Sequence, residues 1–221
     1  MKPLKSAYYF RSLAALARHL RNPFAAVPLL AGMPATVEFR AGITITLLRP
    51  IDLLIAKETL LDDSYRLRNL RDPRYIIDIG ASVGDFALAA AKRFPKCSIA
   101  AFEPDPRYFK ALTRNIKAGE VKNVSLFNEA VGESAESAFR RLLQNRIDLV
   151  KIDCEGAEIE ILSSLSAAEF ANISAITMEY HRFMRSDCNE VLAELLSAHG
   201  FCCQVKPDRY DPCIGYIYAV R

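Results

Sequence analysis

The chain has 221 residues, of which 51% are apolar and 25% are charged, and this composition is ordinary for a globular α/β protein. No segment approaches the roughly 18 consecutive apolar residues of a membrane-spanning helix, and no Cys/His cluster has zinc-finger spacing. The formal net charge is only +3, but residues 1–37 hold five basic residues and no acid, so the remainder carries −2.

The six cysteines predict a reducing environment. None forms a C-x-x-C pair, and several fall within predicted strands, where free cysteine behaves as a small core residue. The apolar stretches of the leader are short and are interrupted by Arg18, Arg21 and Pro28, which is unlike an export signal. We therefore expect a cytoplasmic protein.

The first predicted element is a basic helix with one apolar stripe. Tyr9, Leu13, Leu16 and Leu20 are spaced by 4, 3 and 4 residues. The favoured interpretation is that this helix packs on the body of the protein or on a second subunit. The alternatives are peripheral contact of residues 1–30 with an anionic membrane surface, or contact with RNA.

Residues 36–48 alternate in polarity and turn at Ala41–Gly42, which predicts a small hairpin. Residues 49–70 are then predicted to be helical, with Asp72–Pro73 ending the helix. We expect residues 1–72 to form an extension that acts as a substrate lid or packing element. Residues 73–221 are expected to form the main domain.

From Arg74 onward, strands alternate with helices of ten or more residues, which predicts right-handed βαβ units on a parallel sheet. Strands are expected near 75–79, 98–103, 123–127, 147–152, 174–180, 200–206 and 214–220. Helices are expected near 83–94, 106–118, 135–144, 156–169 and 188–199. Only the eight residues "KPDRYDPC" lie between the last two strands, which is too short for a crossover helix, so these strands should form an antiparallel hairpin. A seven-stranded, mostly parallel sheet that ends in this way is the Rossmann-like arrangement of class I methyltransferases.

The string "IIDIGASVGDF" places Gly80-Ala81-Ser82-Val83-Gly84 between a buried strand and a helix. In doubly wound folds such a turn holds an adenosine-containing cofactor. The middle glycine of the dinucleotide fingerprint G-x-G-x-x-G is absent, so the signal for a pyrophosphate is incomplete. The turn alone leaves NAD and S-adenosylmethionine open.

Two acids refine this interpretation. Glu103, followed by Pro104, ends the second strand 23 residues after Gly80, a distance that suits contact with the ribose diol of either cofactor. Asp78 precedes the turn, where a carboxylate would repel a pyrophosphate and favour a ligand with an amine and a sulfonium. These residues favour S-adenosylmethionine. Helix capping by Asp78 or Ser82 is the structural alternative.

Five strings together resemble the FkbM family of S-adenosylmethionine-dependent methyltransferases: "IIDIGASVGDF", "AFEPDPRYFKALTRNI", "NEAVGE", "DLVKIDCEGAEIEIL" and "ITMEYH". The resemblance covers about residues 38–203, and the "KIDCEGAE" block is its most specific part. It implies a Rossmann-like fold and O-methylation of a hydroxyl on a natural product or on a sugar of a glycan. It places Asp78, Gly80, Gly84 and Glu103 around the cofactor, and it suggests Asn128, Glu129 and Ala130 near the adenine.

The candidate catalytic residues follow the fourth and fifth predicted strands of the main sheet. Asp153 is expected to border the cofactor and to position the acceptor hydroxyl or take its proton, and Lys151 is a further catalytic candidate. Glu179 and His181 lie two apart on one strand end, hence on the same face. Asp153, Glu179 and His181 also make a plausible oxygen and nitrogen set for a divalent ion, although we predict no resident metal. Capping of the next helix by Asp153 is the structural alternative.

The predicted partner is a small-molecule or glycan acceptor. Enzymes that methylate ring nitrogens of nucleic acids often carry Asp/Asn-Pro-Pro-Tyr after the fourth strand, and this chain has Asp153-Cys154-Glu155-Gly156 there. An acidic entrance also fits poorly with a phosphate backbone, so nucleic acid is disfavoured. RNA methylation and a non-catalytic scaffold that binds the cofactor remain as alternatives, and homo-oligomerisation is left open.

Overall fold

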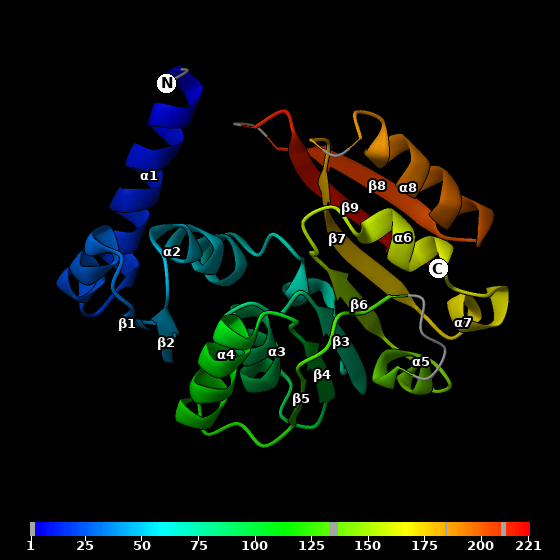
Figure 1. Ribbon diagram of the computed structural model, residues 1–221, viewed down its shortest axis with the longest axis horizontal. Helices are drawn as coiled ribbons and strands as arrows, with labels where there is room; N and C mark the ends of the chain where they lie inside the picture. Colours follow the sequence, from blue (N-terminus) through cyan, green and yellow to red (C-terminus); the bar gives the residue numbers. More distant parts are fainter. Residues whose placement is uncertain (1–2, 133–136, 184, 209–210) are drawn as a thin grey trace.

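The computed structural model describes residues 3–132, 137–183, 185–208 and 211–221. Its centre is a seven-stranded sheet with the order β5-β4-β3-β6-β7-β9-β8 (Figure 1). The strands from β5 to β7 are parallel, whereas β9 is antiparallel to both of its neighbours. The strands are β3 (Tyr75–Ile79), β4 (Ser98–Phe102), β5 (Val124–Phe127), β6 (Leu149–Ile152), β7 (Ala175–His181), β8 (Cys202–Pro207) and β9 (Ile214–Val220). The predicted Rossmann-like fold with a C-terminal antiparallel hairpin is confirmed.

Helices cover both faces of this sheet, because alternate residues of each buried strand point to opposite sides. Ile77 and Ile79 of β3 pack in the core under the later helices, whereas Ile76 packs with the α3 side. One face carries α3 (Asp85–Arg93) and α4 (Pro106–Ala118). The other carries α5 (Ala138–Leu142), α6 (Glu158–Ser163), α7 (Ala167–Ala171) and α8 (Cys188–Ala198). Residues 135–136 of the predicted helix at 135–144 lie outside the described residues.

The N-terminal extension forms the end of the molecule opposite α8 and β8 (Figure 1). It comprises α1 (Pro3–His19), the 3₁₀-helix η1 (Pro23–Ala31), β1 (Ala35–Phe39), β2 (Ile43–Leu47), α2 (Pro50–Lys57), the π-helical turn η2 (Glu58–Asp62) and the 3₁₀-turn η3 (Leu67–Asn69). The predicted hairpin is confirmed as β1 and β2, which pair in antiparallel register. The hairpin joins the main domain through buried Asn115 of α4, whose side-chain amide bonds both the N–H and the C=O of Thr46.

The basic helix α1 packs on the body through its C-terminal half. Leu16 and Leu20 are buried with the hairpin in one apolar core, whereas Leu13 is 63% exposed. The side chain of Tyr9 lies outside the described residues. Among the described residues, no helix combines the length and the hydropathy that crossing a bilayer requires.

Two predicted helices are wrong in their extent. The helix expected over 49–70 ends as η2 at Asp62, because Asp63 and Arg66 both adopt left-handed backbone angles that an α-helix cannot continue through. The chain therefore turns and places Tyr65 in the core. The helix expected over 156–169 is two short helices, α6 and α7, because Ser166 and Glu169 form a capping box that starts a new helix.

Candidate functional site

A cavity of about 300 Å³ opens at the carboxyl ends of the central parallel strands, where doubly wound folds bind their ligands. Six of the predicted cofactor-binding residues line it together: Gly80, Glu103, Pro104, Glu129, Ala130 and Asp153. Phe102, Cys154 and Ile161 add apolar wall that the sequence analysis did not single out. The cavity thus gathers residues that are up to 82 positions apart, and we refer to it as the cofactor cavity.

The turn after β3 can be made only by glycine at position 80. Gly80 has a φ of +76°, and a Cβ placed there would lie 1.8 Å from the backbone oxygen of Asp153. The backbone N–H groups of Gly80 and Ala81 both donate to the carbonyl of Phe102. This close approach of two strand ends forms the floor of the cofactor cavity.

Glu103 is held by the backbone of the same turn. The N–H of Ser82 donates to one carboxylate oxygen of Glu103 at 2.7 Å, and the N–H of Asp105 donates to the other at 2.8 Å. Burial raises the pKa of Glu103, and these two N–H donors oppose that rise without cancelling it. The carboxylate is therefore fixed in direction while each oxygen keeps a second lone pair for a ligand hydroxyl.

The interpretation of Asp78 is corrected. Its side chain is fully buried, and one carboxylate oxygen lies 3.0 Å from Nζ of Lys151, so the charge that we expected to select the ligand is neutralised inside the protein. Burial raises the pKa of Asp78 to about 6 against the attraction of Lys151. The argument that Asp78 disfavours a pyrophosphate therefore does not hold.

Lys151 is equally unsuited to the catalytic role predicted for it. Its ammonium is buried, pairs with Asp78 and donates to the carbonyl of Gly80 at 2.7 Å. Burial lowers the pKa of Lys151, but attraction by Asp78 and Asp153 outweighs burial and raises it. Lys151 is a positioning residue that braces the glycine turn.

The other predicted cofactor residues act behind the cavity wall. A Cβ on Gly84 would lie 2.6 Å from the side chain of Leu112, so this glycine serves the packing of α3 on α4. Ala81 is buried in the core, and Ser82 contributes its backbone to Glu103. The amide of Asn128 donates to the carbonyls of Glu103 and Pro104 and so orients that loop. The N-cap residue of α3 is Gly84, and no side chain donates or accepts a capping hydrogen bond there. Capping by Asp78 or Ser82 is therefore excluded.

A second cavity, of about 330 Å³, adjoins the first, and we call it the acceptor cavity. Asp153 and Glu155 line both cavities. The acceptor cavity brings together the predicted residues Asp153, Glu179 and His181 with apolar side chains of α2 and β9 such as Ile55 and Ile214. Asp153 is thus the side chain across which a group in one cavity would meet a group in the other.

Tyr65 connects two of these carboxylates and was missed by the sequence analysis. Its hydroxyl donates to Oδ2 of Asp153 at 2.8 Å and lies 3.4 Å from Oε2 of Glu179. Its ring packs edge-on against Phe86 and Tyr216. Burial raises the pKa of Tyr65 well above its ordinary value, and the negative charges of Asp153 and Glu179 raise it further, so the hydroxyl keeps its proton. The sequence did not indicate a role for Tyr65, because this residue falls in the segment that was predicted to be helical.

The carboxylate of Glu179 lies within 4.8 Å of that of Asp153. Burial raises the pKa of Glu179 well above its ordinary value, and repulsion from Asp153 adds to the rise. A carboxyl in this condition holds a proton at a higher pH than usual, which suits the exchange of a proton with a nearby hydroxyl.

His181 is 5% exposed and is held from behind by a buried carboxylate. Its Nδ1 lies 3.2 Å from Oε1 of Glu158, and its Nε2 lies 3.6 Å from the exposed carboxylate of Glu155. Burial lowers the pKa of His181, but the contact with Glu158 outweighs burial and raises it. Glu158 also accepts the backbone N–H groups of Cys154 and Gly156 and so orders the loop before α6. The N-cap residue of α6 is Ala157, and no side chain caps this helix, so capping by Asp153 is not observed.

One ligand atom from each of Asp153, Glu179 and His181 lies within 4.8 Å of the other two. This is the set that the sequence analysis judged plausible for a divalent ion. The absence of a resident metal stays a prediction.

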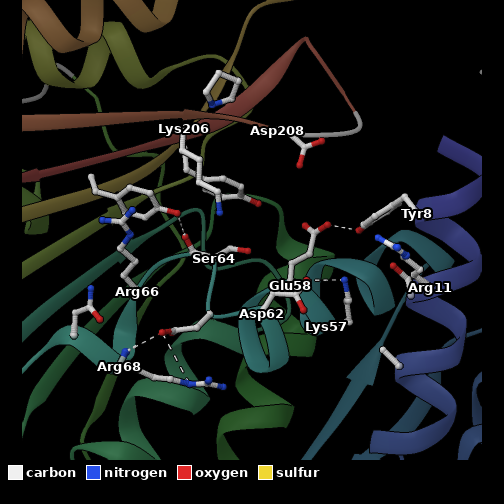
Figure 2. Close-up of a pocket in the computed structure, with 17 residues that line it drawn as sticks. Tyr8, Arg11, Lys57, Glu58, Asp62, Ser64, Arg66, Arg68, Lys206 and Asp208 are labelled. Carbon is white, nitrogen blue, oxygen red and sulfur yellow. Dashed lines mark hydrogen bonds and ion pairs between the residues drawn. The ribbon is translucent and has the colours of Figure 1, made fainter. Parts of the chain in front are cut away.

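A third cavity, of about 850 Å³, lies between α1, residues 57–69 and the β8–β9 hairpin (Figure 2). Its walls carry charges of both signs, including Arg66, whose guanidinium lies 3.4 Å from the ring centre of Tyr218. Tyr8, Glu58 and Asp208 line this polar cleft and the acceptor cavity alike. Figure 2 shows Glu58 of η2 directed at Tyr8, whose hydroxyl donates to it. Local sequence patterns single out none of these three residues, because only the fold brings α1, η2 and the residue after β8 together.

Comparison with known proteins agrees with this geometry. Residues 136–203 match the family model described as the methyltransferase FkbM domain. The chain is 27% identical over 190 residues to methyltransferase sdnD of Sordaria araneosa, which covers 57% of this chain and 73% of that protein. It is 31% identical over 83 residues to methyltransferase 1 of Beauveria bassiana, covering 38% of this chain and 33% of that protein. The resemblance inferred from the motifs is confirmed.

The fold also resembles solved methyltransferases. The structure of TYW2 from M. jannaschii in complex with AdoMet superposes with a TM-score of 0.56, at 16% identity, over 84% of each chain. At this identity the similarity supports the fold alone. The family match and the fold together support a methyltransferase, and S-adenosylmethionine as the cofactor of this chain stays a prediction.

Proposed function

We propose that this S-adenosylmethionine-dependent methyltransferase, whose residues 136–203 match the FkbM methyltransferase domain, methylates a hydroxyl group of a sugar or natural product. One observation carries the proposal. Asp153 lines the cofactor cavity and the acceptor cavity at once, and it stands in a cluster of proton-exchanging groups. A methyl group and its acceptor would therefore meet beside a carboxylate that can receive the acceptor's proton.

The cofactor cavity fits an adenosine-containing methyl donor. Glu103 directs two fixed oxygens that can accept the ribose hydroxyls, and Gly80 leaves room for close approach of the ligand to the backbone. Ala130 and Phe102 supply apolar wall for a base. When bound, the sulfonium of S-adenosylmethionine supplies an already activated methyl group.

The residues of the acceptor cavity supply alignment and proton transfer. Asp153 is in position to accept the hydroxyl proton, and the Tyr65 hydroxyl fixes the direction of its carboxylate. Glu179 lies 3.4 Å from the same Tyr65 hydroxyl, and its raised pKa makes it a second carboxyl beside Asp153 that can hold a proton. The contact with Glu158 raises the pKa of His181, which favours the positively charged form of its ring beside these carboxylates.

The acceptor class follows from the walls of the cavities. Carboxylates that converge on a small space accept hydrogen bonds from a polyhydroxylated ligand, and the adjoining polar cleft offers donors as well as acceptors for the remainder of a larger acceptor. The same concentration of acids in the acceptor cavity opposes an RNA backbone.

Transfer of a labelled methyl group tests this proposal. Wild-type protein and D153N would be incubated with labelled S-adenosylmethionine and three acceptor sets: sugars, hydroxylated natural products and RNA. We expect O-methylated product from one of the first two sets and at least about 100-fold slower transfer by D153N. Label on RNA would overturn the acceptor class. Cofactor binding without transfer to any acceptor would support a non-catalytic scaffold instead.

A matched control is available on the same strand pair. Asp148 precedes β6 and accepts the backbone N–H groups of Arg74 and Tyr75, far along the strand from the cavities. D148N removes a comparable carboxylate and should leave the rate of transfer unchanged in the folded fraction.

A further inference from the structure

The 3₁₀-helix η1 carries a column of exposed apolar side chains. Phe24 is 87% exposed, Val27 56% and Leu30 81%. A 3₁₀-helix has three residues per turn, so residues spaced by three lie one above another on the same face. In the sequence this stretch was considered only as an apolar segment of the leader, interrupted by Pro28. Among the described residues, these are some of the most exposed large apolar side chains.

This column borders an apolar groove of about 510 Å³ between α1, η1 and α2. Every described residue that lines the groove is apolar, including the exposed Leu13 and Ile51. Leu30 lines the groove, whereas Phe24, which is 87% exposed, does not, so a small ligand in the groove would leave Phe24 uncovered. Their occupant must therefore be an extended apolar phase or a macromolecule.

Charge selects between these occupants. Arg18 and Arg40 are exposed near the link between α1 and η1, and Arg21 in that link is 56% exposed and lies 3.3 Å from the carboxylate of Glu38. The carbonyl of Arg18 accepts from Nε of Arg40, so these residues lie together. A second copy of the chain would bring like charges together at this face, whereas anionic lipid headgroups complement them.

We propose that η1 and the flanking arginines dock this enzyme on the surface of an anionic lipid bilayer. Phe24, Val27 and Leu30 enter the boundary between headgroups and acyl chains, and the arginines contact the headgroups. The helix lies on the membrane and does not cross it. This inference depends on the N-terminal extension alone and holds for any acceptor.

The groove also connects the docking face with the methyl-transfer site. Ile51 and Leu54 of α2 line both the groove and the acceptor cavity. Phe183, 56% exposed, stands at the rim of the acceptor cavity. The groove and the acceptor cavity thus share a wall formed by α2.

Co-sedimentation with vesicles tests the proposal. The full-length protein would be mixed with vesicles of phosphatidylcholine, with and without phosphatidylglycerol. We expect binding to the anionic vesicles that weakens as salt is added. The double variant F24D/L30D should bind at least about tenfold more weakly, and R18Q about fivefold more weakly.

The control variant V205D/V220D introduces the same charges at exposed apolar positions on β8 and β9, at the opposite end of the molecule. It should bind vesicles like the wild type. All variants should bind S-adenosylhomocysteine with unchanged affinity in calorimetry, which shows that they are folded and separates this test from that of the methyl-transfer site. Equal loss of vesicle binding in both double variants would overturn the proposal. So would a wild-type dimer that F24D/L30D dissociates while neither protein binds vesicles.

Discussion

The two adjoining cavities are built in different ways. The cofactor cavity is formed by the ends of regular strands, and its main ligand-facing group, Glu103, is fixed by backbone N–H groups. The acceptor cavity is formed by side chains from α2, η2, β7 and β9, and its central contact is a side-chain bond from Tyr65 to Asp153. The first depends on backbone geometry that a glycine permits. The second depends on side-chain packing across 88 positions of sequence.

This difference predicts that backbone changes will damage the first region most. In G80A the new Cβ would lie 1.8 Å from the oxygen of Asp153, at a φ of +76°. Because a rigid strand end cannot yield, we expect the free energy of unfolding to fall by about 3 kcal/mol or more. Chemical denaturation measures the change.

Gly200 provides the matched control, because it has a φ of +84° but open space around its Cβ position. In G200A the free energy of unfolding should fall by only about 1 to 2 kcal/mol, which is the cost of holding a residue with a Cβ in the left-handed backbone conformation. Equal losses in the two variants would show that the approach of β3 to Asp153 is not tight.

Side-chain changes should instead act on the second region with the fold intact. Y65F removes the hydroxyl that orients Asp153 but keeps the ring against Phe86 and Tyr216. We expect kcat to fall about tenfold, the usual effect of losing one hydrogen bond to a charged group, with no change in cofactor affinity. Steady-state assays with the identified acceptor, together with calorimetry, separate these quantities.

Y218F is the corresponding control, because the Tyr218 hydroxyl donates to the carbonyl of Ser64 and makes no contact with Asp153. A similar loss of kcat in Y218F would mean that Tyr65 acts through general packing. In that case the comparison between the regions would fail.

The smallest expected effect concerns the pH dependence of stability. The pKa of Glu179 is raised by burial and by Asp153, so the native protein holds this proton more tightly than the unfolded chain does. The free energy of unfolding must then fall as the pH rises from the ordinary carboxyl pKa to the raised one. In E179Q the free energy of unfolding should fall less over this pH range than in the wild type. The stability of the variant relative to the wild type should therefore be greatest at the upper end of the range.

Denaturation curves of wild type, E179Q and E190Q across that pH range measure the effect. Glu190 is exposed on α8 and serves as the control. A wild-type decline that persists unchanged in E179Q would place the responsible proton on another group.

The same contrast explains what the sequence could reveal. The strand, turn and helix around Gly80 are encoded by contiguous residues, so β3, the turn and α3 were predicted with nearly correct bounds, and Glu103 was found by its spacing. The hairpin of β1 and β2 also follows from local alternation. The division of residues 1–72 from 73–221 stays a prediction.

Residues that depend on long-range packing were not accessible in this way. The left-handed angles at Asp63 and Arg66 interrupt a segment whose composition favours helix, and only this interruption turns Tyr65 toward Asp153. The neutralisation of Asp78 required knowing that β6 lies beside β3, which brings Lys151 to it. Local patterns therefore defined the cofactor region well and the acceptor region only through Asp153, Glu179 and His181.

The central claim is that the cavity bounded by Gly80 and Glu103 binds the cofactor. Calorimetric titration of wild type and E103Q with S-adenosylhomocysteine tests it most directly, with E190Q as the control. The wild type should bind, and E190Q should bind with the same affinity. E103Q should bind about 10- to 100-fold more weakly, because this variant loses the charged hydrogen bonds that Glu103 makes to the ribose. Equal affinity in wild type and E103Q would contradict it.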